Sequence, residues 1–259
     1  MSPSSIDESA RVAASARIHP SVSIGAFAVI GAGVVIGPRG VVGNHVVIHD
    51  GSEVGEDARV DDHAVIGKQP MRARRSATTR AGREAPARVG SECIIGTGAI
   101  LYAGCSIDNS VMVADYATVR ERVTVGPQTI VGRGVSIEND CTIGARCKIE
   151  TNAYITANSK LGDDVFIAPG VLTSNDRFLG RTSERFDHFE GATVRDGARL
   201  GVGAVILPGI EVGAEAVVSA GAVLTHSAAA ATVHIGVPAR ATRPVDTAQL
   251  LQNDDSRKT

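Results

Sequence analysis

Polar side chains recur at intervals of 18 residues in the middle of the chain. Two such series are Arg122, Asp140 and Asn158, and Glu121, Asn139 and, two intervals further on, Asn175. Carboxylates and amides bind hydroxyl and amino groups, and a carboxylate also accepts protons. The residues therefore favour either a pocket for a polar small molecule or an ordinary solvated surface, since exposed residues are commonly polar.

A few more residues are candidates for acid–base or orienting roles. Glu138 and Glu150 each follow an aliphatic residue, and Asn152 lies two residues beyond Glu150. His188 lies further along the chain, in one segment with Asp176. Asn152 equally suits a tight corner, because asparagine tolerates a left-handed backbone. A histidine in a loop is often only solvated, so both interpretations stay open for His188 as well.

The intervals of 18 follow from a repeat of six residues. An aliphatic residue stands at every sixth position from Ile6 to Ile66, from Val89 to Ile167 and from Val194 to Val218, thirty positions in all. A small or β-branched residue usually follows four positions later. Glycine often comes directly after the aliphatic residue, where a corner needs conformational freedom. Each hexad is therefore predicted to form a short strand and a turn, with two side chains pointing inward.

Three hexads per turn place residues 18 apart directly above one another in a parallel β-coil. The repeat predicts about ten coils at a strand spacing of roughly 4.8 Å, around an interior too thin for many large side chains. The composition agrees, with 29 glycines, 3% aromatic residues and no tryptophan. We expect one all-β domain over residues 1–245 and a polar C-terminal tail over residues 246–259.

Two segments interrupt the repeat and are expected to leave the coil as loops. Residues 67–88 hold seven lysines and arginines against one acid, Glu84, and residues 173–191 hold Phe178, Phe186 and Phe189. An arginine-rich loop can bind phosphate groups, or it can be merely solvated and mobile. The phenylalanines predict a loop that reaches a neighbouring subunit beside a cleft, or one that only fastens the oligomer.

The cysteines and histidines give little sign of redox or metal chemistry. Cys93, Cys105, Cys141 and Cys147 all fall on the small inward position of their hexads. We therefore expect buried thiols without disulfides, as in a cytoplasmic protein. His45 and His63 are 18 apart and should stack. Zinc needs further ligands that the sequence does not place, so no metal is expected.

Charge and hydropathy indicate a soluble globular protein. The net charge is −2 at pH 7, and 43% of the residues are hydrophobic. No apolar stretch approaches the roughly 18 residues of a membrane helix, and the N-terminus lacks the basic start and apolar block of a signal peptide. We expect a cytoplasmic protein that binds neither membranes nor nucleic acid.

From residue 6 to about residue 240, the hexad pattern resembles the left-handed β-helix of hexapeptide-repeat acyltransferases. Within it, the C-terminal part resembles bacterial nucleotide-sugar N-acetyltransferases, most clearly in GDDVFIAPG at 162–170, GATVRDGARLGVGAVILPGIEVG at 191–213 and GVPAR at 236–240. This resemblance implies a homotrimer that moves an acetyl group from acetyl-CoA to the amino group of a nucleotide-linked sugar. The sites are then expected between neighbouring subunits.

The resemblance also suggests roles for individual residues. Lys148 and Ile149 are followed by Glu150, Thr151 and Asn152, where the acetyltransferases have Gln-Asn-Asn and an asparagine approaches the acceptor amine. Asn152 matches that asparagine, whereas Glu150 departs from the pattern and is a candidate general base. The candidate catalytic residues are therefore Asn152, Glu150 and His188.

Acceptor and donor are expected to bind to different sets of residues. The acceptor pocket is expected to hold Glu138, Asn139, Asp140, Asn158, Asn175 and Asp176. The pantetheine arm of acetyl-CoA is expected along Gly170, Gly203, Ala204, Ala220 and Gly221, and its phosphates at Arg240 and Arg243. The glycines and alanines could equally be corner or inward residues that the coil itself requires.

Two other functions remain open. One is an acyltransferase of the same fold that takes its acyl group from an acyl carrier protein or acylates a hydroxyl group; such enzymes also carry a loop near the middle of the helix. The other is a non-catalytic β-helix that serves as a scaffold or binding module. Affinity for acyl-CoA separates the scaffold from an acetyl-CoA-dependent enzyme.

Overall fold

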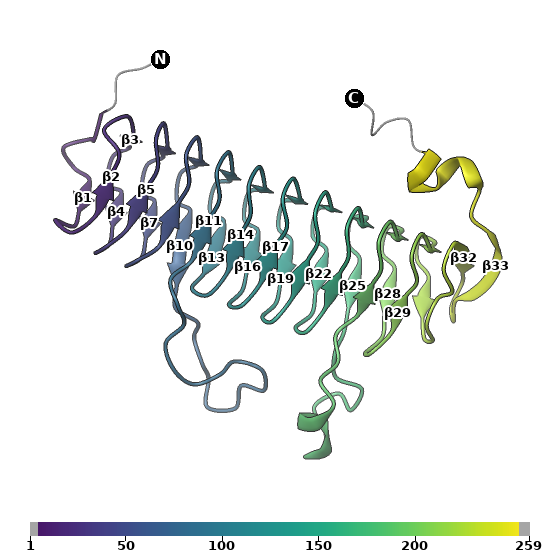
Figure 1. Ribbon diagram of the computed structural model, residues 1–259. Coiled ribbons are helices and arrows are strands. Elements are labelled where there is room, and N and C mark those ends of the chain that lie inside the picture. Colours follow the sequence, from purple (N-terminus) through teal and green to yellow (C-terminus); the bar gives the residue numbers. More distant parts are fainter. Residues whose placement is uncertain (1–4, 254–259) are drawn as a thin grey trace.

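The computed structural model describes residues 5–253, which wind into a long three-sided coil of very short strands (Figure 1). The strands form three parallel sheets of 12, 11 and 10 strands, here called sheets A, B and C. Each strand pairs with the strand three positions later in the chain, so the coil advances one sheet per hexad. The predicted all-β, left-handed parallel β-helix is confirmed, and the strand numbers agree with about ten coils.

Sheet B consists of β1 (Arg11–Val12), β4 (Val29–Ile30), β7 (Val47–Ile48), β10 (Val65–Lys68), β13 (Ile100–Tyr102), β16 (Thr118–Val119), β19 (Ser136–Ile137), β22 (Tyr154–Ile155), β25 (Leu172–Thr173), β28 (Val205–Ile206) and β31 (Val223–Leu224). Sheet C consists of β2 (Arg17–Ile18), β5 (Val35–Ile36), β8 (Glu53–Val54), β11 (Arg88–Val89), β14 (Ser106–Ile107), β17 (Thr124–Val125), β20 (Thr142–Ile143), β23 (Lys160–Leu161), β26 (Thr193–Val194) and β29 (Glu211–Val212).

Sheet A consists of β3 (Ser23–Ile24), β6 (Val41–Val42), β9 (Arg59–Val60), β12 (Ile94–Ile95), β15 (Met112–Val113), β18 (Ile130–Val131), β21 (Lys148–Ile149), β24 (Phe166–Ile167), β27 (Arg199–Leu200), β30 (Val217–Val218), β32 (Thr232–Ile235) and β33 (Arg240–Pro244). All pairs in this sheet are parallel except the last, in which β33 runs antiparallel to β32. This final hairpin closes the C-terminal end of sheet A.

The core is a single thin column of aliphatic side chains. In most strands the second residue points inward and is buried, as are Ile137, Ile143 and Ile149. The small residue before the next strand fills the corner, and all four cysteines occupy such positions as free, buried thiols, as predicted. Burial raises the pKa of Cys141 to about 12, so this thiol stays protonated and unreactive at neutral pH.

The corners between sheets need a left-handed residue in almost every coil. Glycine fills many of these positions at no steric cost, but bulky residues occupy others. Phe27, His45 and His63 all have φ near +57°, and their rings stack one coil above another, with centroids 5.1 and 4.9 Å apart. The stacking of His45 on His63 confirms the 18-residue register predicted from the sequence.

Two long loops leave the coil at the same kind of corner, between sheets B and C. The first excursion (residues 69–87) joins β10 to β11, and the second excursion (residues 174–192) joins β25 to β26. Four other sheet-B strands, β13, β16, β19 and β22, lie between them. Both loops therefore hang from one edge of the coil (Figure 1), here called the B–C edge. The second contains the short 3₁₀ helix η1 (Glu184–Asp187).

The C-terminal segment folds back over the last coils. After β33 it forms η2 (Thr247–Gln249) and η3 (Leu251–Asn253). The backbone N–H of Leu251 donates to Glu215, and Arg199 donates to Gln249. Part of the predicted polar tail is thus attached to the coil, and residues 254–259 of that tail lie outside the described residues.

Candidate functional site

The predicted site residues lie on two edges of the coil. Those on the B–C edge or in the second excursion are Glu138, Asn139, Asp140, Asn158, Asn175, Asp176 and His188. Those on the edge between sheets A and B, here called the A–B edge, are Glu150, Asn152, Gly170, Gly203, Ala204, Ala220 and Gly221. The numbering already carried this information, because Glu138 and Glu150 are 12 residues apart and 12 is two thirds of a coil.

Asp140 is the centre of a charged network on the B–C edge. Arg122, directly one coil away, donates to both of its carboxylate oxygens, at 2.7 and 2.9 Å. Asn139 donates at 2.6 Å and Arg80 of the first excursion at 3.0 Å. Arg122 also pairs with Glu84. The predicted column of Arg122 and Asp140 is confirmed, and it holds the first excursion against the coil.

These contacts change the acidity of Asp140. Burial opposes ionisation, but hydrogen bonds from Arg122 and Asn139 and the charges of Arg122 and Arg80 outweigh it and lower the pKa of Asp140. The ionised carboxylate therefore stabilises the folded state above its unfolded pKa of about 3.9, and this stabilisation is lost as the pH falls toward the lower folded value.

We expect the first excursion to loosen in acid. After correction for intrinsic rates, amide exchange in residues 77–84 should accelerate as the pH falls from about 6 to about 3, and Asp140→Asn should show the same acceleration at neutral pH. Asp57→Asn is the matched control, because Asp57 makes a comparable pair with Arg39 at a corner that carries no loop. Unchanged exchange in Asp140→Asn would mean that other contacts hold the excursion.

A second network lies beside the first, toward sheet B. Arg120 donates to Glu121 at 2.8 and 3.1 Å and to Glu138 at 3.1 Å. Its guanidinium lies 4.9 Å from the ring centroid of Tyr102, one coil away, and donates to Thr79 of the first excursion at 3.3 Å. Glu121 is fully buried. The sequence could not place Thr79 here, because no repeat governs the excursion.

The second excursion is organised around Asp176. Its carboxylate accepts hydrogen bonds from the backbone N–H groups of Phe178 and Gly180 and from Arg185. Arg185 in turn lies over the rings of Phe186 and Phe189, with centroids 5.3 and 5.1 Å away. Asp176 therefore shapes the loop that presents the phenylalanines.

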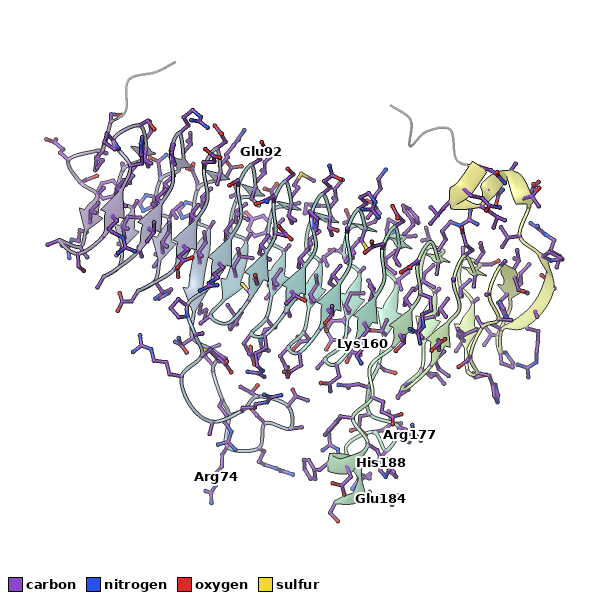
Figure 2. The ribbon with its side chains drawn as sticks, in the orientation of Figure 1. Arg74, Glu92, Lys160, Arg177, Glu184 and His188 are labelled. Atoms are coloured by element: carbon purple, nitrogen blue, oxygen red, sulfur yellow. The ribbon has the colours of Figure 1, made fainter. Side chains whose placement is uncertain are left out.

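The tip of the second excursion lies away from the coil. His188 lies there with its side chain 42% exposed and Nε2 3.8 Å from Glu184, as Figure 2 shows. Asn175, at the base of the excursion, donates to the carbonyl oxygen of Ala157 at 3.4 Å. Asn175 therefore fastens the excursion to the coil, whereas His188 faces solvent.

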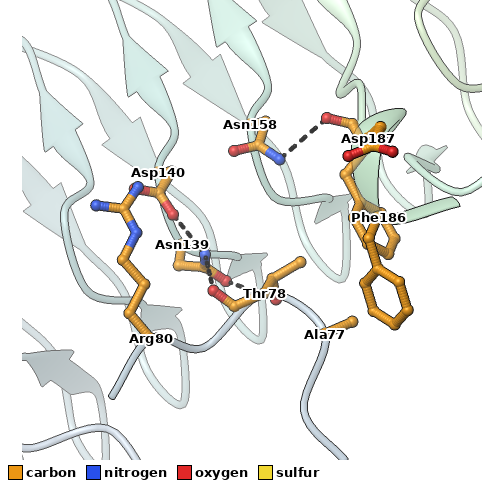
Figure 3. A pocket seen from close by; sticks show the side chains of 9 residues that line it. Ala77, Thr78, Arg80, Asn139, Asp140, Asn158, Phe186 and Asp187 are labelled. Carbon is orange, nitrogen blue, oxygen red and sulfur yellow. Dashed lines mark hydrogen bonds and ion pairs between the residues drawn. The ribbon is translucent and has the colours of Figure 1, made fainter. Parts of the chain in front are cut away.

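A cleft of about 260 Å³ lies between the two excursions. It is lined by Ala77, Thr78, Arg80, Asn139, Asp140, Asn158, Phe186, Asp187 and Phe189. Figure 3 shows Phe186 on one side, Arg80 on the other, and the amides of Asn139 and Asn158 on the coil between them. A second, wider cleft continues from it past Lys160 and Thr193. The combined surface offers an aromatic ring, amides and two cations to one ligand.

Arg80 is only loosely required by its partner in this cleft. Its side chain is 66% exposed, and Asp140 already has Arg122 and Asn139 as partners. The amide of Asn158 donates to the carbonyl oxygen of Phe189 at 3.3 Å. The remaining hydrogen-bonding capacity of Arg80 can therefore serve a ligand without leaving Asp140 unpaired.

The A–B edge has a different character near its C-terminal end. Asn152, Gly170, Gly203 and Gly221 follow one another as left-handed corner residues, with φ between +58° and +68°. No atom lies within 4 Å of the position that a Cβ would take on Gly170, Gly203 or Gly221. Ala220 is exposed beside them, whereas Ala204 is buried inside the coil and offers only its backbone. The edge is thus an open strip of backbone, and Asn152 adopts the left-handed corner conformation.

The remaining predicted residues lie at the C-terminal end. Arg240 and Arg243 belong to β33 and are exposed; their guanidinium groups donate only to the neighbouring backbone carbonyls of Ala239 and Pro244. Among residues 5–253, no group of three or more histidine, cysteine, aspartate or glutamate side chains is arranged to hold a metal ion. In the same range, no helix has the length and apolar character needed to span a bilayer.

Family models match the repeat in several places. Residues 140–175 match the model for the bacterial transferase hexapeptide, and residues 12–38 and 192–226 match the hexapeptide repeat of succinyl-transferase. This chain is a hexapeptide-repeat protein. The predicted resemblance to hexapeptide-repeat acyltransferases is thereby confirmed at the level of repeat and fold. No curated protein matches the sequence.

Solved structures similar to this hexapeptide-repeat protein include several acyltransferases. The UDP-N-acetylglucosamine acyltransferase of Francisella novicida matches with a TM-score of 0.52 and 22% identity, over 96% of this chain and 73% of that one. The Arabidopsis UDP-N-acetylglucosamine acyltransferase gives 0.47 and 16%, over 95% and 79%. The serine acetyltransferase of Neisseria gonorrhoeae gives 0.39 and 24%, over 47% and 45%. The first of these similarities establishes the shared fold.

Proposed function

We propose that this hexapeptide-repeat protein transfers an acetyl group from acetyl-CoA to the amino group of a nucleotide-linked amino sugar, at sites between the subunits of a homotrimer. The cleft between the two excursions is the observation that carries the proposal. Phe186, 59% exposed, can stack on a base, Arg80 and Lys160 can pair with phosphates, and Asn139 and Asn158 can bind sugar hydroxyls.

The donor is proposed to bind along the A–B edge. The open backbone at Gly170, Gly203 and Gly221 admits the pantetheine arm, whose amides can hydrogen bond to exposed backbone. Arg240 and Arg243 then lie further toward the C-terminal end, where they can meet the CoA phosphates. Asn152, at the other end of this strip, is proposed to orient the acceptor amine or the thioester carbonyl.

The outward faces of the sheets support a trimer. The outward positions of sheet C are mostly charged or hydroxylated, such as Lys160, Thr142 and Glu211. Those of sheet B are mostly apolar, such as Ile100, Leu172 and Val205. A long apolar face is typical of a protein–protein contact. With sheet B turned toward its neighbours, the B–C edge of one protomer meets the A–B edge of the next, and the two half-sites join.

One observation favours a second acceptor or donor class. The tip of the first excursion carries Arg72, Arg74 and Arg75, all exposed, and Figure 2 shows Arg74 pointing away from the coil. Such a tip suits an acidic carrier protein, which would deliver the acyl group in place of CoA. That alternative also agrees with the acyltransferase activity named for the Francisella novicida protein.

The reaction class is tested by thiol release from acetyl-CoA with a panel of UDP- and dTDP-linked amino sugars, with sugar-free and long-chain acyl-CoA controls. Release only in the presence of an amino sugar would support the proposal and identify the acceptor. Release with no acceptor in the panel, together with no calorimetric binding of CoA, would contradict it and leave the carrier-protein enzyme or the scaffold.

Asn152 is expected to matter for turnover more than for stability. Asn152→Ala should lower kcat about 100-fold, the usual cost of removing one hydrogen-bond donor at a reacting carbonyl. Gln128→Ala is the matched control, because Gln128 is also an exposed left-handed corner residue. Both variants should lose the same small amount of thermal stability. A kcat loss no larger than that of the control would make Asn152 a corner residue only.

A further inference from the structure

Glu138 differs from the other candidate acid–base groups because it shares one guanidinium with a second carboxylate. Arg120 uses Nε and Nη2 for Glu121 and only Nη1 for Glu138. The side chain of Glu121 is inaccessible, whereas that of Glu138 is 25% exposed. Glu138 is therefore the partly accessible member of a carboxylate pair and the less firmly held of the two.

The surrounding charges leave this cluster negative. Its carboxylates are Glu84, Glu121, Glu138 and Asp140, and its guanidinium groups are Arg80, Arg120 and Arg122. Four negative charges against three positive ones leave one negative charge without compensation. A proton that arrives here is thus attracted to the cluster, and the other three carboxylates each accept at least two hydrogen bonds or are held by two arginines or the excursion's backbone.

The environment of Glu138 also favours its protonated form. Burial raises the pKa of Glu138, the charge of Arg120 opposes the rise, and the nearby Glu121 adds to it. Tyr154, on the next coil of sheet B, has a raised pKa as well, because of burial and the Glu138 carboxylate. Glu138 therefore takes up a proton more readily than an exposed glutamate does.

The position of Glu138 suits proton transfer better than that of its rivals. It directly precedes Asn139 and Asp140, which line the cleft, and Arg120 attaches its cluster to Thr79 of the first excursion. His188 lies at the tip of the second excursion with its ring facing solvent. Glu150 lies on the A–B edge, with the proposed donor site.

We propose that Glu138 is the general base of the acetyl transfer, an inference that rests on the function proposed above. The amine nitrogen forms a bond to the thioester carbonyl carbon, and the carbon–sulfur bond breaks. The proton that the nitrogen loses moves to the Glu138 carboxylate, and the CoA thiolate leaves with a proton returned from Glu138. No oxidant, reductant or metal enters the balance.

The test compares Glu138→Gln and Glu138→Asp with the wild-type protein. Glu138→Gln keeps an acceptor for Arg120 but cannot take a proton, so kcat should fall at least about 100-fold, as expected for loss of a general base. The acid limb of the pH profile of kcat/KM should disappear in Glu138→Gln and persist in Glu138→Asp with a shifted midpoint. Calorimetric binding of CoA and of the acceptor should stay within about threefold of wild type.

Glu92→Gln, which changes an exposed corner carboxylate on the same coil surface, is the control for charge alone. If Glu138→Gln retains kcat within about threefold, or keeps the acid limb, the inference is overturned while the proposed function stands. If the wild-type protein itself transfers no acetyl group, the proposed function fails and the inference fails with it. Should Glu138→Gln not fold, the pH profile of Glu138→Asp decides, since an unshifted acid limb excludes Glu138 as the base.

Discussion

Leucine in place of Gly203 and Gly221 is expected to abolish measurable binding of acetyl-CoA. The new side chains would extend into open space, because no atom lies within 4 Å of either Cβ position. They would therefore occupy the strip along which the pantetheine arm is proposed to lie, without a clash inside the coil. Calorimetry with CoA measures the effect, and we expect affinity to fall by more than about 100-fold, the loss of a substantial part of the binding free energy.

The same change carries a stability cost that must be separated from the loss of binding. Leucine in a left-handed conformation costs roughly 1–2 kcal/mol, and both glycines have φ near +66°. Gly33→Leu provides the control, since Gly33 has φ +67° and an equally open Cβ position on the distant N-terminal part of the B–C edge. Equal losses of Tm per site with retained CoA affinity would place the donor elsewhere.

Removal of the two aromatic rings of the second excursion is expected to raise KM for the acceptor strongly. Stacking of a base on an aromatic side chain contributes about 1–3 kcal/mol, so Phe186→Ala with Phe189→Ala should raise KM about tenfold or more while kcat at saturation changes little. Steady-state kinetics with the acceptor identified in the panel gives both values.

Leu179→Ala is the matched control for this change, because Leu179 lies in the same excursion and is 87% exposed. The control should leave KM unchanged. If the double variant behaves like the control, the phenylalanines serve only to shape the excursion or to fasten a neighbouring subunit, and gel filtration would then report a weakened trimer.

Mixing the two inactive proteins tests whether sites form between subunits. In randomly assembled trimers of the Gly203/Gly221 variant and the Phe186/Phe189 variant, a site that combines edges of two protomers is intact about one time in four. About a quarter of the wild-type turnover at low acceptor concentration should therefore return on co-expression. Sites contained within one chain would show no such recovery.

The periodicity of the sequence predicted everything that the coil itself determines. Inward residues such as Ile149, the buried cysteines and the stacking of His45 on His63 all follow from the hexad, because every coil repeats the same geometry. The pair of Arg122 and Asp140 was predictable for the same reason. In these parts of the chain, the number of a residue fixes its place.

The excursions obey no such rule, and most of the candidate site depends on them. Nothing in the repeat places Arg80 on Asp140, Thr79 on Arg120 or Phe189 on Asn158, since these contacts join residues 60, 41 and 31 positions apart. The pairing of charges in a loop depends on tertiary packing that a local pattern does not encode. The division of the candidates between two edges was, by contrast, available from simple counting and is a finding of the structure only because the counting was not applied.

Both excursions leave the coil without disturbing it. Across the first, Glu53 and Val54 pair in register with Arg88 and Val89, and across the second, Lys160 and Leu161 pair with Thr193 and Val194. The coil therefore acts as a ruler: the gap between the two loops is set by whole turns, and four sheet-B strands measure it out. Insertion or removal of one 18-residue turn between them would widen or narrow the gap by one step of about 4.8 Å, so the size of ligand that bridges the loops is graduated in units of the coil.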